Sequence, residues 1–231
     1  MNRIAVLLAA GSLALSACAG PAIAAEEPVN APAAARVAKE GAGGSGGLKT
    51  AIFAGGCFWG VEGVFSHVKG VKSAVSGFHG GNAASAKYDI ITSGATAHAE
   101  SVKITYDPAV VRYDQLLRIF FSVVADPTLK NRQGPDVGAH YRSAIVPMNK
   151  EQAAVARAYI AQLDKAGLWK RPIVTAIEGY KAFYVAEGYH QDYMINNPRS
   201  GYIVRWDAPK VAALKAMFPN HYRAEFLRDA G

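Results

Sequence analysis

Strand-like and helix-like segments follow one another along this chain without strict alternation, and that order constrains the fold more than any other feature. Apolar residues at every second position predict strands, and apolar residues three and four apart predict helices. Strands are expected at residues 50–54, 71–78, 100–106, 141–146, 174–177 and 182–185, and helices at 57–68, 113–124, 149–166, 189–196 and 207–217. Because doubly wound folds need regular alternation, the pattern predicts an α+β domain with a small mixed sheet.

Capping residues mark the starts of two of these helices. Asn149 is expected to cap the helix at 149–166, with Gln152 three residues later. Asp207 is expected to cap the last helix, with Pro209 in its first turn. The length of 231 residues fits one domain, or two, with a sizeable core.

Composition excludes several classes of protein. With 51% apolar and 19% charged residues, the chain is too hydrophobic to be a disordered protein. Its 25 basic and 18 acidic residues give a formal charge of +7, but the basic residues are scattered and form no nucleic-acid-binding motif, so no nucleic-acid partner is expected. Two cysteines, Cys18 and Cys57, are too few for a disulfide framework or a multi-cysteine zinc site. The histidines show no metal-ligand spacing, so no metal is expected.

The first 24 residues are typical of an export signal. Arg3 precedes an apolar stretch from Ile4 to Leu15, which is shorter than the roughly 20 residues that span a bilayer as a helix. Two cleavage sites fit the sequence. Residues 15–18 resemble a bacterial lipobox, in which Cys18 is lipidated, whereas the A-I-A motif at 22–24 fits an ordinary site that leaves Ala25 first. Either processing step removes Cys18 as a free thiol.

The rest of the chain divides by composition. Residues 25–48 are rich in Ala, Gly, Pro and Glu and are expected to form a flexible linker. A folded domain is expected at 49–223, followed by a C-terminal tail at 224–231. The export signal predicts a periplasmic or outer-membrane-associated protein, tethered to the membrane where Cys18 carries lipid.

Cys57 is the residue most informative about chemistry. It follows an apolar strand and two glycines, and it stands at the first turn of an expected helix. The N–H groups and the positive end of the helix dipole favour a thiolate there, and the glycines let a ligand approach closely. The alternative is a small buried apolar residue, and position alone does not separate the two.

Six motifs spread over residues 56–193 carry a resemblance to a known family. They are G-C-F-W-G at 56–60, G-A-T-A-H-A-E at 94–100, D-P-T at 126–128, N-R-Q-G-P-D-V-G at 131–138, Y-R-S at 141–143 and Y-H-Q-D-Y at 189–193. In this order they resemble the A-type peptide methionine sulfoxide reductases. Ala97 and Ala125 depart from the family pattern, which often has Gly and His there.

The resemblance implies that 49–223 is a catalytic domain that reduces free or protein-bound methionine sulfoxide, at the S epimer, as oxidative damage repair. Cys57 is then the nucleophile that attacks the sulfoxide sulfur, and Glu100 is the acid that protonates the leaving oxygen. A carboxyl that keeps its proton near neutral pH needs apolar surroundings. Attack leaves methionine and a sulfenic acid on Cys57. Without the resemblance, Glu100 would read as a solvated charge at the start of a strand.

The resemblance also implies roles for the remaining site residues. Tyr88 and Tyr141 align with two tyrosines whose hydroxyls hold the sulfoxide oxygen, and Asp136 aligns with an aspartate that orders the pocket. Phe58 and Trp59 resemble the aromatic pocket for the substrate methyl group, since sulfur–aromatic contacts are favourable. Each role has a structural alternative. The two tyrosines could simply pack in the core, Asp136 could be a turn residue after Pro135, and Phe58 and Trp59 could belong to a buried helix face.

The chain departs from most of the family in its cysteines. Ile203 follows Gly201-Tyr202, where many members carry a resolving cysteine, and no cysteine occurs after Cys57. We therefore expect a one-cysteine enzyme whose sulfenic acid is reduced by an external thiol, which is glutathione, a thioredoxin-like protein or a glutaredoxin-like protein. The resemblance further implies a two-layer α+β sandwich with a ferredoxin-like core and no metal, flavin or nicotinamide cofactor. We expect a monomer.

Other functions remain as alternatives. His98 or His190 beside Cys57 could indicate a papain-like hydrolase, but the resemblance assigns both histidines structural roles. A thiol peroxidase would form the same sulfenic acid without needing Glu100. A binder of oxidised methionine segments would need Phe58 and Trp59 but not the Cys57 thiol.

Overall fold

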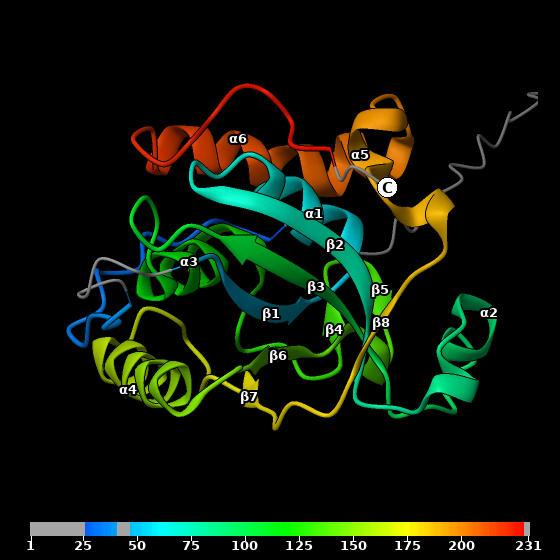
Figure 1. Cartoon of the computed structure of the whole chain (residues 1–231), viewed down its shortest axis with the longest axis horizontal. Coiled ribbons are helices and arrows are strands. Elements are labelled where there is room, and N and C mark those ends of the chain that lie inside the picture. The colour runs from blue at the N-terminus through cyan, green and yellow to red at the C-terminus, as the bar shows by residue number, and fades with distance from the viewer. Residues whose placement is uncertain (1–25, 41–46, 229–231) are drawn as a thin grey trace, which may run out of the picture.

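The computed structural model of the protein describes residues 26–40 and 47–228. At its centre is a six-stranded sheet of order β7-β6-β1-β3-β2-β8 (Figure 1). The strands are β1 (Lys49–Gly55), β2 (Val71–His79), β3 (Ala99–Tyr106), β6 (Ser143–Val146), β7 (Ala176–Ile177) and β8 (Phe183–Val185). Neighbouring strands are antiparallel except β6 and β7, which are parallel. A separate short hairpin pairs β4 (Arg132–Gln133) with β5 (Asp136–Val137).

The order of helices and strands along the chain identifies the type of fold of the core. The helices are α1 (Phe58–Ser66), α2 (Tyr88–Ile91), α3 (Tyr113–Ile119), α4 (Lys150–Ala166), α5 (Tyr193–Asn196) and α6 (Ala208–Met217), with wider π-type turns at Phe120–Val124 and Ile203–Asp207. The elements β1-α1-β2-β3-α3-β6 form a βαββαβ unit with strand order β6-β1-β3-β2, which is the ferredoxin-like arrangement. The predicted α+β class with a mixed, ferredoxin-like sheet is confirmed.

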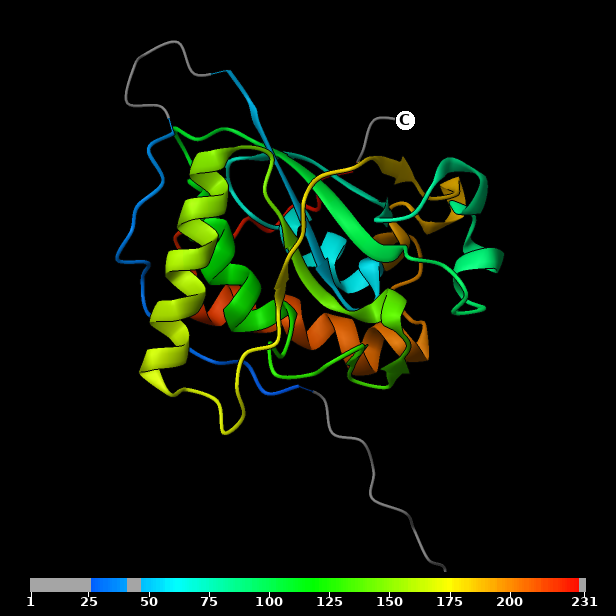
Figure 2. The same ribbon diagram turned by 90° about the horizontal axis from the view of Figure 1, so that it is seen from below.

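Helix α1 lies between the sheet and α6 (Figures 1 and 2). The core beneath it is aromatic, because the Phe53 ring lies 5.5 Å from Phe65 and 5.3 Å from Phe120, and all three are buried. Burying side chains of this size stabilises the fold by about 1.5–3 kcal/mol each. This packing fixes the start of α1, and so the position of Cys57, against the end of β1.

Residues 26–40 pack along the domain, so the expectation of a flexible linker is wrong for this part of 25–48. Ala31 and Ala38 are buried, and the Ala38 N–H donates to Asp114 over 3.0 Å. The carboxylate of Glu40 accepts a hydrogen bond from the buried Tyr106 hydroxyl at 2.6 Å. Composition alone had suggested that this segment is exposed to solvent. Its small alanine side chains instead let it lie close to α3. The glycine-rich residues 41–46 lie outside the described residues.

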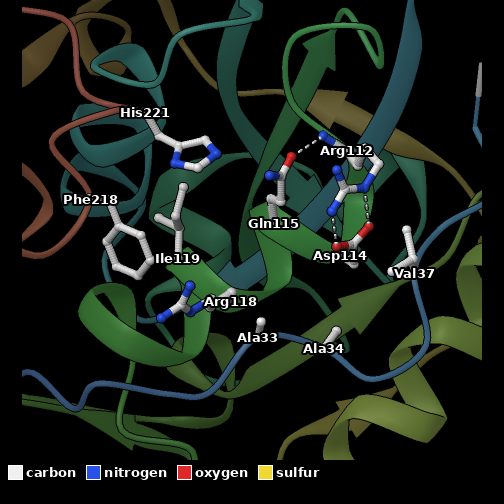
Figure 3. A pocket seen from close by; sticks show the side chains of 10 residues that line it. All are labelled: Ala33, Ala34, Val37, Arg112, Asp114, Gln115, Arg118, Ile119, Phe218 and His221. Atoms are coloured by element: carbon white, nitrogen blue, oxygen red, sulfur yellow. Dashed lines mark hydrogen bonds and ion pairs between the residues drawn. The ribbon is translucent and has the colours of Figure 1, made fainter.

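Figure 3 shows how this N-terminal arm, residues 26–40, meets α3 and the C-terminal turn. Ala33, Ala34 and Val37 face a cavity of about 160 Å³ that is also lined by Arg118 and Phe218. Arg118 donates to the Ala31 carbonyl oxygen at 2.8 Å and stacks over the Phe218 ring at 5.2 Å. This cavity contains none of the predicted site residues, and its polar groups hold the arm to the domain.

Two predicted helices differ from the structure. The segment expected as one helix at 189–196 is a 3₁₀ turn at Gly188–His190 followed by α5, because Asp192 between them has φ 55° and donates its N–H to Glu62. Asp207 stands at the N-cap position of α6 and Pro209 in its first turn, as expected, but the Asp207 backbone is helical and its carboxyl caps no N–H group. The helix begins earlier, with the π-type turn at Ile203–Asp207, and buries the Asp207 side chain instead.

The helix at 149–166 follows its expected start signal. The Asn149 side chain accepts from the Gln152 N–H at 2.9 Å, and Gly167 ends α4 in the left-handed region. The expected C-terminal tail is attached as far as residue 228, since the Leu227 N–H donates to the Ser66 carbonyl oxygen and Arg228 donates to Asn196. Within the described residues no helix is both long and apolar enough to cross a membrane. The expected export signal, Cys18 included, lies outside them.

Candidate active site

Cys57 lies at the N-cap of α1, directly after β1, and is 9% exposed. Gly56 before it has φ 88°, and a Cβ there would come within 2.5 Å of Gln133. Only glycine therefore allows the chain to turn from the strand into the helix with the sulfur at the edge of the core. The short link between β1 and α1 fixes the thiol in place.

The Glu100 side chain lies beside the start of the same helix. It projects from β3, is 1% exposed, and accepts a hydrogen bond from the Phe58 N–H at 3.0 Å. Burial raises the pKa of this carboxyl to about 8, against the lowering effect of that N–H, and the nearby carboxyls of Asp136 and Asp207 raise it further. Glu100 therefore carries a proton at neutral pH, as the predicted apolar surroundings require.

Of the two interpretations left open for Cys57, the structure favours the buried, neutral thiol in the free enzyme. Burial raises the pKa of the thiol well above its usual value, and the charges of Glu100, Asp207 and Asp136 raise it further. The Trp59 N–H at the helix start lowers it, but less than burial raises it. The helix dipole is thus outweighed by desolvation, and the resting sulfur is a neutral thiol.

Tyr88 and Tyr141 reach the same pocket from α2 and from the 3₁₀ turn at Ala139–Tyr141. Burial raises the pKa of Tyr88 to about 12, and the charges of Glu100 and Cys57 contribute. Burial and the Glu100 charge also raise the pKa of Tyr141 well above its usual value. Both side chains are therefore neutral phenols that can donate a hydrogen bond to an oxygen atom held near Cys57 and Glu100.

Phe58 and Trp59 lie on different sides of α1. Phe58 is buried, with its ring 5.7 Å from Phe78 and 5.0 Å from His190. Trp59 is partly exposed, stacks on Tyr193 at 3.7 Å and donates its indole N–H to His190 Nδ1 at 3.1 Å. Of the two rings, that of Trp59 is the more exposed.

The two weighed histidines have packing and hydrogen-bonding partners of their own. His190 accepts from the Trp59 indole, and His98 is buried with ring nitrogens near the Asn82 carbonyl oxygen and the Gly81 N–H. Neither forms a hydrogen bond with Cys57 among the bonds of the described residues. A hydrolase pair of cysteine and histidine is therefore absent from this part of the chain.

Asp136, on β5, accepts a short hydrogen bond from the Tyr202 hydroxyl. Burial raises the pKa of Asp136, while the Tyr202 bond and the Lys210 charge lower it. Tyr202 did not emerge from the motifs, although it stands directly before the position where a resolving cysteine was expected. The structure places it between Asp136 and the edge of the Trp59 ring, 5.8 Å away.

Further residues that sequence reasoning missed line a narrow polar cavity at Cys57. Its lining comprises Glu26, Cys57, Gln133, Gly134, Pro135, Asp136, Tyr202, Trp206 and Lys210. Tyr202, Trp206 and Lys210 are four residues apart, which places them on one helix face and is a signal that the sequence does carry. Glu26 had no such signal, because it belongs to the arm that was expected to be a linker. It accepts from the Gly134 N–H at 2.6 Å.

Asp207 lies next to this cavity, against α1. A Cβ at Gly60 would come within 2.2 Å of the Asp207 carboxyl oxygen, so the glycine makes room for that carboxyl. Both oxygens are buried without a hydrogen-bond partner among the described residues, and Lys210 Nζ lies 4.0 Å away. Burial raises the pKa of Asp207 to about 7. Within the described residues no cluster of three His, Cys, Asp or Glu side chains is arranged to hold a metal.

A buried thiol next to a protonated carboxyl and two phenols defines a thiol enzyme that can deliver a proton to a substrate oxygen. The chain belongs to the peptide methionine sulfoxide reductase family, whose sequence profile matches residues 49–222. It is 58% identical over 176 residues to peptide methionine sulfoxide reductase MsrA 2 of Mesorhizobium japonicum, covering 76% of this chain and 90% of that protein. The MsrA of Deinococcus radiodurans is 47% identical over 173 residues, covering 75% of this chain and 84% of that protein.

Solved structures agree with this assignment. Reduced Mxr1 of Saccharomyces cerevisiae superposes with a TM-score of 0.57 at 29% identity, covering 77% of this chain and 93% of that one. Methionine sulfoxide reductase A of Corynebacterium diphtheriae gives a TM-score of 0.56 at 30% identity, covering 78% and 86%. The predicted family and enzyme class are confirmed, and the protein is a thiol-dependent reductase that repairs oxidised methionine.

Proposed function

We propose that Cys57 removes the oxygen of methionine (S)-sulfoxide with Glu100 as the proton donor, and that an external thiol then regenerates Cys57. The observation that carries the proposal is the buried Glu100 carboxyl. It stays protonated at neutral pH and is bonded to the Phe58 N–H, next to Cys57 in the chain.

The first half-reaction oxidises Cys57 and reduces the substrate. The Cys57 sulfur attacks the sulfoxide sulfur while Glu100 protonates its oxygen, and the thiol proton replaces the one that Glu100 gives up. The hydroxyl then passes to the Cys57 sulfur as the bond between the two sulfurs and the S–O bond of the substrate break, and the products are methionine and a Cys57 sulfenic acid. Tyr88 and Tyr141 hold the oxygen, Trp59 and Phe58 form the aromatic wall for the methyl group, and Asp136 orders the pocket through Tyr202.

The second half-reaction uses two equivalents of thiol. The first forms a mixed disulfide with Cys57 and releases water, and the second releases the oxidised thiol and restores Cys57. The sequence supports this route, since it has no cysteine after Cys57. Glutathione, a thioredoxin-like protein and a glutaredoxin-like protein are the candidate reductants.

We also propose that the enzyme acts as a monomer outside the cytoplasm, on oxidised proteins or free methionine sulfoxide. The apolar residues 4–15 and the two alternative processing sites support export, with a lipid tether if Cys18 is modified. An oxidising compartment generates methionine sulfoxide, which fits a repair enzyme there.

The test is turnover of racemic methionine sulfoxide with dithiothreitol, followed by chiral chromatography. The proposal predicts loss of the S epimer alone, abolished in Cys57→Ser. Loss of the R epimer, or equal activity in the variant, would contradict it.

A further inference from the structure

The polar cavity described above ends at Cys57. Asp136, which orders the substrate pocket, lines this cavity, whereas the three side chains proposed to act on the sulfoxide oxygen do not: Glu100, Tyr88 and Tyr141. That cavity reaches Cys57 between the β4–β5 hairpin, the arm and the helix face that carries Tyr202, Trp206 and Lys210. The groups proposed to act on the sulfoxide oxygen and the polar cavity therefore both lie around the Cys57 side chain.

The charges around this cavity are unequal. Two acidic residues, Glu26 and Asp136, line it, and Asp207 is buried next to it. Among the described residues that line it, Lys210 is the single basic one. Lys210 Nζ lies 3.9 Å from Glu26 and 4.0 Å from Asp207, and its side chain is 15% exposed. These distances are too long for hydrogen bonds, so the ammonium group keeps its donors available to a ligand.

The chemistry of the second half-reaction needs such an arrangement. A thiolate that displaces hydroxide from a sulfenic acid approaches the sulfur on the side opposite the departing oxygen, because the breaking and forming bonds must be aligned. The oxygen arrives from the side of Glu100 and the two tyrosines. The incoming thiol must then reach Cys57 from another side, and the polar cavity reaches Cys57 without being lined by Glu100, Tyr88 or Tyr141.

We propose that this cavity is the access route of the reducing thiol and that Lys210 is a positioning residue that attracts and orients the thiolate, an inference that rests on the proposed reduction by an external thiol. The thiolate forms a bond with Cys57 Sγ, the S–O bond breaks, and the oxygen leaves as water. Glu100 donates a proton to the departing hydroxyl, and it takes up in return the proton that the incoming thiol released. The cavity is narrow, about 10 Å³, so the side chains of Lys210 and Trp206 must rotate to admit the thiol.

The unequal charge also predicts which thiols react. The carboxylates of Glu26 and Asp136 repel a thiol that carries its own carboxylate. We therefore expect 2-mercaptoethanol, which is uncharged, to react faster than mercaptoacetate, which is of similar size but negatively charged. Glu26→Gln removes one of these charges and is expected to raise the rate with mercaptoacetate relative to 2-mercaptoethanol by about 2- to 5-fold. An unchanged ratio would contradict the charge assignment.

The decisive experiment separates the two half-reactions in the chain lacking residues 1–24, from which Cys18 is absent. Without reductant, the methionine formed in a single turnover reports the first half-reaction. With excess sulfoxide, kcat/KM for dithiothreitol reports the second. Lys210→Met should leave the single-turnover rate within about twofold and lower kcat/KM for dithiothreitol by about tenfold, with Lys210→Arg retaining most of it.

Lys215→Met, on the same helix, is the matched control and should behave as the unaltered enzyme. Equal thiol rates in Lys210→Met and the unaltered enzyme would overturn the inference, as would an equal fall in both half-reactions. Failure of the proposed function would look different, because the unaltered enzyme would then form no methionine in the absence of thiol.

Discussion

The proton on Glu100 gives the most specific prediction about the reaction. Its pKa of about 8 means that about nine-tenths of the enzyme carries the proton at pH 7 and about one-tenth at pH 9. Because the resting thiol is also neutral, the reactive form holds both protons. The rate of sulfoxide reduction should therefore be flat below pH 7 and fall by about tenfold per pH unit above 8.

Glu100→Gln tests the same idea by substitution. An amide can still accept the Phe58 N–H but cannot protonate the leaving oxygen, so the rate should fall by about 10²- to 10⁴-fold and lose its pH dependence above pH 8. The assay is rapid-quench single turnover without thiol, since thiol ionisation would obscure the profile of steady-state turnover. Glu225→Gln, an exposed residue far along the chain, is the control. A rate that rises steadily through pH 9, or a Gln variant that reacts normally, would refute the role of Glu100.

Three further predictions concern stability and redox state. In the folded state Glu100 keeps its proton at pH values where the unfolded chain has lost it, so the free energy of unfolding falls as pH rises from about 4.5 to 8. Glu100→Gln should therefore raise the melting temperature at pH 8.5 and not at pH 4. Glu40→Ala removes the acceptor of the buried Tyr106 hydroxyl and should lower the free energy of unfolding by about 1–3 kcal/mol in urea titration; no change would mean that this hydrogen bond contributes nothing to stability. After one turnover, mass spectrometry of the chain lacking residues 1–24 should find no internal disulfide, and finding one would refute the one-cysteine scheme.

The elements of the core could be predicted because their patterns are local. Short apolar segments predicted β1 and β2 and alternating apolar residues predicted β3 nearly to their ends, and the Asn149 cap predicted the start of α4. The motif residues could be placed in one pocket because the family resemblance supplied long-range information that periodicity does not hold. Cys57, Glu100 and Tyr141 come from separate segments that only the folded sheet brings together.

What could not be predicted depends on tertiary burial. The dipole of α1 suggested a thiolate at Cys57, but desolvation and three carboxyl groups reverse the effect. Asp207 has the sequence context of an N-cap, yet its carboxyl is buried against Gly60 because the helix starts one turn earlier. The arm's composition is typical of a linker, and its alanines pack against α3 only because that helix offers a complementary surface.

The central claim is that a single cysteine carries the oxygen through the reaction, and a stoichiometric single turnover tests it most directly. The chain lacking residues 1–24, which contains Cys57 but not Cys18, is mixed with excess methionine (S)-sulfoxide without thiol, and both methionine and the modification of Cys57 are measured. The account predicts one methionine per enzyme and one oxygen atom retained on Cys57, trapped as a sulfenic acid adduct. Methionine formed with Cys57 unmodified would contradict it.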